Sequence, residues 1–183
     1  ALYGLVRSVG GLLDAFGVRW WASAGTLLGA LRNGGLMPQD CDVDIAIWRP
    51  HAHHLVRPAF RAALAAAGIA SYQMPIYLEF RFCLTHVPAM GEQRSVDGQL
   101  SCVEPYIDGH LADVVPGRPS RWHYIHQTDL QFAHDFPLHG LLRHRKRGVD
   151  VVAIEDVLQR VPFGHHAEVW VPPSWASNEY LDV

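Results

Sequence analysis

Two aspartates one residue apart, Asp42 and Asp44, are the side chains of this sequence that most directly suggest chemistry. Asp42 directly precedes the stretch Val43 to Trp48, and Asp44 lies within it. This stretch is rich in branched apolar residues and therefore predicts a β-strand. Side chains at i and i+2 of a strand share a face, so the two carboxylates should point the same way. Mg²⁺ or Mn²⁺ would relieve their repulsion, together with water and substrate phosphates. Alone, the motif is short and weak, and a solvated strand face, or a turn that Asp40 and Asp42 cap, explains it better than a metal site does.

The residues before the aspartates could hold a phosphate. Gly25 and Gly29 allow backbone N–H groups to approach an anion closely, and a helix predicted at about 26–32 offers a positive N-terminal end. Thr26 adds a hydroxyl, and Arg32 could reach the same anion with a bidentate fork. The glycines could instead ease helix packing, and both interpretations can hold at once.

A divalent ion normally takes a further carboxylate from a neighbouring strand. Asp113 is flanked by apolar residues, as an aspartate of such a site would be. Asp108 is the runner-up, because the following Gly109 suggests a hairpin turn that would account for the aspartate. Glu79 could instead pair with Arg81 or another neighbour.

The rest of the chain mixes helices and strands without a regular βαβ rhythm, which predicts an α+β fold. Apolar spacing predicts helices over 2–16, 53–67 and 175–181, with Pro58 suggesting a later start for the second. Strands are predicted over 18–22, 69–73, 77–85, 100–107 and 111–115, the last two joined by a turn at Asp108-Gly109.

Overall composition bounds the class of protein. A chain of 183 residues, 49% of them hydrophobic, suits one globular domain over 1–183. A net charge of −3 provides no basic field for duplex nucleic acid, and no apolar run approaches the roughly 18 residues of a membrane span. The first residue is Ala1 rather than Met, which suggests a fragment of a longer chain. Three cysteines leave open either one disulfide or three free thiols.

The stretch from Ala24 to Ile47 resembles the signature of the LicD and fukutin-related family over its whole length. The likeness is weaker at Ala112 to Pro116, which is similar to the family's Asp-hydrophobic-aromatic-Pro element. Four positions depart from the family pattern: Gln39 stands for the usual Trp, Ala24 for the first Gly, Cys41 for a polar residue and Val115 for an aromatic.

That resemblance implies a nucleotidyltransferase-like mixed sheet flanked by helices, in a LicD-like catalytic domain. It implies metal-dependent transfer of a phospho-alcohol, such as phosphocholine or ribitol phosphate, from a CDP-activated donor to a sugar hydroxyl of a glycan. By position, the resemblance implies that the metal-binding and catalytic carboxylates are Asp42, Asp44 and Asp113. Gly25, Thr26 and Arg32 match the family's donor-phosphate segment, and Asp40 matches the first acidic position of its signature. Mg²⁺ or Mn²⁺ is the implied cofactor.

Two other functions stay open at this stage. A nucleotidyltransferase would place a nucleoside monophosphate on a small acceptor, and a non-catalytic module would only bind a glycan or nucleotide. The compartment is also open: a eukaryotic fukutin-like member would be in the Golgi lumen and a bacterial LicD-like member in the cytoplasm.

Two clusters lie outside this motif. His51, His53 and His54 could offer ligands to a structural zinc, although no cysteine is near them in sequence. The basic run Arg143–Arg147 is typical of a solvated face, and it could instead bind the donor diphosphate or an acidic acceptor.

Overall fold

The computed structural model describes residues 1–74, 79–85, 102, 105–115, 118–124, 136–137 and 158–172. The predicted helix at 175–181 and the basic run Arg143–Arg147 lie outside these residues. The side chains of residues 74, 113–115, 118–124 and 136–137 are likewise outside the description, although their backbone is within it.

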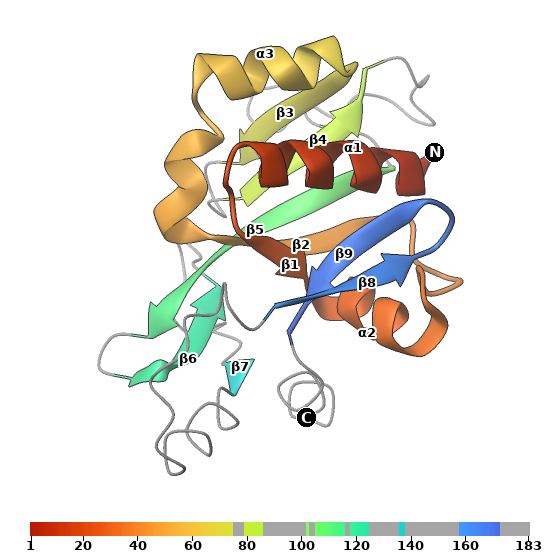
Figure 1. Ribbon diagram of the computed structural model, residues 1–183, viewed down its shortest axis with the longest axis vertical. Coiled ribbons are helices and arrows are strands. Elements are labelled where there is room, and N and C mark those ends of the chain that lie inside the picture. Colours follow the sequence, from red (N-terminus) through yellow and green to blue (C-terminus); the bar gives the residue numbers. More distant parts are fainter. Residues whose placement is uncertain are drawn as a thin grey trace.

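A seven-stranded mixed sheet forms the centre of the molecule (Figure 1). Its main path runs in the order β1 (Trp20–Ala22), β2 (Val43–Trp48), β5 (Tyr106–Val115), β4 (Glu79–Leu84) and β3 (Ile69–Met74). β6 (Arg118–Tyr124) pairs with β5, and β7 (Phe136–Pro137) pairs with β6. β2 and β5 are parallel, and the other described pairs are antiparallel. The predicted α+β class is therefore confirmed.

Helices and a second hairpin pack against this sheet. They are α1 (Leu2–Ala15), α2 (Ala24–Asn33), the 3₁₀ helix η1 (Arg49–His54), α3 (Pro58–Ala66) and the hairpin of β8 (Gln159–Phe163) and β9 (Ala167–Val171). Figure 1 shows α1 and the β8–β9 hairpin in front of the sheet, with α3 beside β3. None of the helices that the structure describes is long and apolar enough to span a membrane.

The helix predicted over 53–67 is divided in two. η1 ends at His54, and α3 begins at Pro58, as the proline suggested. Proline suits the first turn of a helix because its missing N–H would have no intrahelical acceptor there. Phe60 and Leu64 then lie on one face of α3 and are buried.

Asp14 ties the N-terminal helix to the two hairpin strands. Its Oδ1 accepts hydrogen bonds from the indole N–H groups of Trp20 and Trp170, each 3.0 Å long. Its other oxygen forms an ion pair with Arg160 of β8. One carboxylate thus joins α1, β1, β8 and β9.

The predicted turn at Asp108-Gly109 is wrong, because both residues lie inside the ten-residue strand β5. Gly109 is required there by close packing rather than by a turn. A Cβ at this position would lie 2.7 Å from Ile47 Cδ1 and 3.1 Å from the Phe80 carbonyl oxygen. Glycine in a strand interior often marks such a close approach.

Cys83 and Cys102 form a disulfide, with their Cα atoms 5.7 Å apart. Cys41 is exposed and outside any disulfide. Of the alternatives that the sequence left open, the structure therefore has one bridge, which joins β4 to the segment that leads into β5.

Replacing Gly109 with alanine should destabilise the fold. The added methyl group would overpack the core between β2 and β4, at a cost of about 1–3 kcal/mol in the free energy of unfolding. Gly11 of α1 is the matched control, because a Cβ there would meet nothing within 4 Å. Gly11→Ala should stabilise by about 0.5–1 kcal/mol. Urea denaturation measures both, and equal stability of the two variants would contradict this role of Gly109.

Candidate active site

Three aspartates meet where the central strands lie side by side. Asp44 of β2 and Asp108 of β5 are partners in the register of the parallel pair, and Asp42 directly precedes β2. One carboxylate oxygen from each lies within 4.8 Å of the others. The predicted pair Asp42 and Asp44 is therefore brought together with a third carboxylate, which comes from Asp108.

The position predicted for the third carboxylate, Asp113, lies further along the same strand. Its backbone pairs with His123 of β6, and its side chain lies outside the described residues. The assignment of Asp113 stays a prediction, while Asp108 is the third aspartate among the described side chains.

Helix α2 and its N-cap residue Ser23 hold the backbone of Asp44 at two points. The Asp44 N–H donates to Thr26 Oγ1 over 2.8 Å, and the Ser23 N–H donates to the Asp44 carbonyl oxygen over 3.1 Å. Thr26 is buried, so its hydroxyl oxygen packs against β2. The contact of Thr26 with a donor phosphate stays a prediction, and its observed contact positions Asp44.

Asp40 lies against the first turn of α2. A Cβ on Gly25 would come within 2.9 Å of Asp40 Oδ2, so the absence of a side chain at Gly25 makes room for this carboxylate. The first N–H groups of a helix have no intrahelical partner and favour a negative charge nearby. An acidic side chain therefore already adjoins the helix end at which a phosphate is predicted.

Arg32 lies at the opposite end of α2 and is exposed. At a rise of about 1.5 Å per residue, its backbone is about 10 Å from Gly25 along the helix axis. The structure does not bring Arg32 and Gly25 to the same end of the helix.

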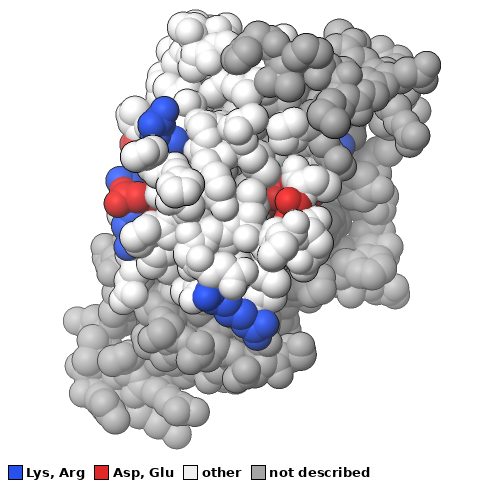
Figure 2. Space-filling view, turned by 90° about the vertical axis from the view of Figure 1, so that its right-hand side faces the viewer, with Lys and Arg blue, Asp and Glu red and all other residues white. Residues whose placement is uncertain are grey.

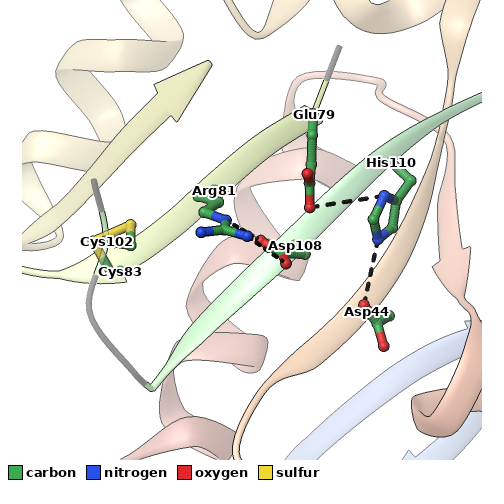
Figure 3. Close-up of polar contacts among 7 residues, drawn as sticks. All are labelled: Asp44, Glu79, Arg81, Cys83, Cys102, Asp108 and His110. Carbon is green, nitrogen blue, oxygen red and sulfur yellow. Dashed lines mark hydrogen bonds and ion pairs between the residues drawn. A yellow bond between two sulfur atoms is a disulfide. The ribbon is translucent and has the colours of Figure 1, made fainter. Parts of the chain in front are cut away.

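Three polar side chains that the sequence interpretation did not assign to the site complete the cluster (Figure 3). Arg81 Nε lies 2.7 Å from Asp108 Oδ1, and Nη2 lies 3.2 Å from Oδ2. His110 Nε2 lies 3.3 Å from Asp44 Oδ1, and Nδ1 lies 3.8 Å from Glu79 Oε1. Arg81 thus pairs with Asp108, and Glu79 faces His110.

A sequence signal for these residues existed in the alternation along β4. Phe80 and Phe82 are buried on the core face, and Glu79 and Arg81 therefore share the other face. The same alternation in β5 places Asp108 on that face. What the local pattern does not reveal is that β4 and β5 are neighbours.

Burial and neighbouring charge shift the protonation of this cluster. Glu79 is only 4% exposed, and burial together with the charge of Asp108 raises its pKa to about 7. Burial also raises the pKa of Asp108, and contacts with Glu79 and Arg81 oppose that rise. Burial lowers the pKa of His110, but the hydrogen bond to Asp44 and the charge of Glu79 outweigh it, so the net direction is upward.

The three aspartates have the chemistry that a hard divalent cation requires. Two oxygens on opposite sides of Mg²⁺ are about 4.2 Å apart, and about 4.8 Å apart for Ca²⁺. The observed limit of 4.8 Å is therefore near to ligand spacing. Asp42 and Asp44 are only partly buried, which leaves room for water or phosphate oxygens.

The histidines of η1 do not form a comparable group. His51 Nδ1 accepts the backbone N–H of Arg19 over 3.0 Å, and His53 Nδ1 lies 2.8 Å from the Pro50 carbonyl oxygen. Within the described ranges, the one group of three or more His, Cys, Asp or Glu side chains close enough to share an ion is the aspartate cluster. The described residues therefore lend no support to the alternative that His51 to His54 bind a structural zinc.

The mixed sheet flanked by helices, with carboxylates on its central strands, is the arrangement that a nucleotidyltransferase-like domain of the LicD type would have. A family model described as LicD/FKTN/FKRP, nucleotidyltransferase domain, matches residues 17–76. The resemblance to the LicD and fukutin-related family is therefore confirmed over these residues, which include Asp42 and Asp44. Asp108 lies beyond the matched stretch and is added by the strand register.

Curated relatives also match this chain, over stretches of comparable length. Ribitol 5-phosphate transferase FKRP of Mus musculus and of Homo sapiens is 50% identical over 48 residues, which make up 26% of this chain and 10% of the relative. An uncharacterized protein of Rickettsia prowazekii (strain Madrid E) is 40% identical over 55 residues, 30% of this chain and 21% of the relative. The alignments thus span about a tenth to a fifth of these relatives.

The raised pKa of Glu79 predicts a pH-dependent stability. Between its ordinary pKa of 4.5 and the folded value of about 7, the native state binds more protons than the unfolded state. Stability therefore falls as the pH rises through this window, by at most about 3 kcal/mol. Glu79→Gln removes this dependence, so its gain in melting temperature should be larger at pH 8 than at pH 5.

Circular dichroism melts in the presence of a chelator test this expectation. Glu168→Gln is the control, because this side chain is 57% exposed. An equal gain in melting temperature for Glu79→Gln at pH 5 and pH 8 would show that the pKa of the wild-type Glu79 carboxyl group is not raised in the folded state.

Proposed function

We propose that this chain is the catalytic part of a metal-dependent transferase, which moves a phospho-alcohol unit from a CDP-activated donor to a sugar hydroxyl of a glycan. The observation that carries the proposal is the convergence of Asp42, Asp44 and Asp108 at one point of the sheet, the first two of which lie in the stretch that matches the LicD family model. The likeness to a ribitol 5-phosphate transferase supports the class of group transferred. Residues 1–183 would form one catalytic domain within a longer protein.

The aspartate cluster would hold Mg²⁺ or Mn²⁺ beside the donor diphosphate. A bound ion would neutralise developing charge on the phosphate oxygens and thereby lower the barrier to displacement. The partly exposed side chains of Asp42 and Asp44 leave access for the donor, and the more deeply buried Asp108 anchors the inner side.

The acceptor hydroxyl oxygen would form the new bond to phosphorus as the bond to CMP breaks. Asp44 or Asp113 would take the hydroxyl proton, and CMP would leave with the electron pair of the broken bond. His110 lies 3.3 Å from Asp44 and orients that carboxylate. Gly25 at the start of α2 remains the proposed contact to the donor phosphates, with Arg32 in a more distant supporting position, and the buried Thr26 would act by holding Asp44.

A nucleotidyltransferase is the second candidate, because the matching family model is itself described as a nucleotidyltransferase domain. The products distinguish the two reactions. Phospho-alcohol transfer releases CMP and leaves a modified sugar, whereas nucleotidyl transfer releases diphosphate and leaves a nucleotide on the acceptor.

Charged side chains of both signs are sparse on one face of the described residues (Figure 2). On the face in Figure 2, acidic and basic side chains adjoin at one edge, and most of the described surface is uncharged.

The disulfide bears on the compartment. Bridges such as Cys83–Cys102 persist mainly in oxidising environments. Of the two compartments that the family resemblance implies, an oxidising lumen is therefore the one we propose. Mass spectrometry of the protein isolated under non-reducing conditions should recover the linked peptides, and free thiols at both positions would contradict this.

Loss of the aspartates should remove nucleotide binding that depends on the metal. Thermal shift with CDP-ribitol, CDP-choline, CDP-glycerol, CTP, UTP and ATP, each with and without Mn²⁺, should show stabilisation of the wild type by a CDP-alcohol only with Mn²⁺. Asp42→Asn, Asp44→Asn and Asp108→Asn should each lose this shift, and they should lower transfer by at least about 100-fold because a metal-held charge is lost.

Glu168→Gln, a change of an exposed acid on β9, should keep both properties. Stabilisation by ATP or UTP equal to that by a CDP-alcohol, with release of diphosphate, would favour the nucleotidyltransferase instead. Wild-type transfer by the Asp42 or Asp44 variant would contradict the mechanism.

A further inference from the structure

Arg81 holds the Asp108 carboxylate, and we propose that it is a positioning residue that fixes Asp108 for divalent-cation binding. The proposal rests on the proposed function, because it takes the three aspartates as the ligands of the ion. It adds a residue from β4, outside the stretch that matches the family model.

The contact is a fork that meets both oxygens of Asp108. Nε to Oδ1 measures 2.7 Å and Nη2 to Oδ2 measures 3.2 Å, so rotation of the carboxylate about its Cβ–Cγ bond would break at least one of them. Each carboxylate oxygen can accept a second interaction. Asp108 can therefore remain bound to Arg81 and still turn an oxygen toward Asp42 and Asp44.

Arg81 is itself held in place from the other side. Its guanidinium carbon lies 4.6 Å from the ring centroid of Tyr106. Tyr106 is the cross-strand partner of Cys83, which is bound to Cys102. Figure 3 shows Arg81 directed at Asp108, with the disulfide on its opposite side. The fork is thus built into the sheet before any ion arrives, which lowers the entropy lost on binding.

A role through charge alone and a positioning role predict opposite effects on cation affinity when Arg81 is removed. If Arg81 acted simply as a positive charge beside three carboxylates, its removal would strengthen cation binding. If it fixes the carboxylate, its removal weakens binding although the local charge becomes more negative. Lysine separates the two, since it keeps the charge and lacks the planar fork.

The dissociation constant for Mn²⁺, measured by the electron paramagnetic resonance signal of the free ion, tests the proposal. Arg81→Lys and Arg81→Gln should each raise it by about 10- to 100-fold, as expected when a group that orients a metal ligand is lost. Arg160→Lys is the matched control, because Arg160 also pairs with carboxylates and stacks on an aromatic ring, 4.7 Å from the centroid of Trp170. Its Mn²⁺ affinity should equal that of the wild type.

The outcomes separate this proposal from the proposed function. The wild type could bind Mn²⁺ while Arg81→Lys binds it with the same affinity, or while Arg81→Gln binds it more tightly. Either result would overturn the role of Arg81 and leave the proposed function standing. No binding of Mn²⁺ by the folded wild type would overturn both. If neither Arg81 variant folds, Tyr106→Leu removes the ring under the guanidinium, and an unchanged dissociation constant in that variant would overturn the proposal.

Discussion

The parallel pairing of β2 with β5 is the interaction on which the rest of the site depends. It is the one parallel pair among the described strands, and its register sets Asp44 beside Asp108 although 64 residues separate them. A shift by one residue would turn one of these carboxylates to the opposite face. The antiparallel pairing of β4 with β5 then brings Arg81 opposite Asp108. Two strand registers therefore assemble side chains from three distant parts of the chain.

The same strands build the hydrophobic core with their other face. Ile45, Ile107 and Phe82 are almost fully buried, and each lies one position away from a polar residue of the site. Gly109 allows β2 and β4 to approach β5 closely enough for this packing. The geometry of the carboxylates is thus maintained by apolar burial behind them, so a change in the core is expected to move the site.

The sequence predicts those features of the fold and site that depend on residues close together in the chain, and it misses those that depend on contacts between distant residues. Asp42 and Asp44 were found because their relation depends on two-residue periodicity within one strand, and the family resemblance came from one continuous stretch. Asp108 ranks only as the runner-up by sequence because Asp-Gly is a local turn signal, yet the glycine at 109 is required by packing against Ile47, which is 62 residues away. Arg81 and His110 carry no local mark of function. Their roles arise from strand order, which no short stretch of the sequence encodes.

The composition of the cluster explains why the basic residues are there at all. Four carboxyl groups, from Asp42, Asp44, Glu79 and Asp108, face two basic side chains, Arg81 and His110. Acidic groups gathered on a partly buried surface oppose folding unless they are paired, protonated or bound to a cation. Arg81 offsets Asp108, His110 offsets Asp44, and Glu79 holds its proton up to about pH 7. Asp42 and Asp44 are the less buried members of the cluster, so the proposed ion and a phosphate would reach the site from their side.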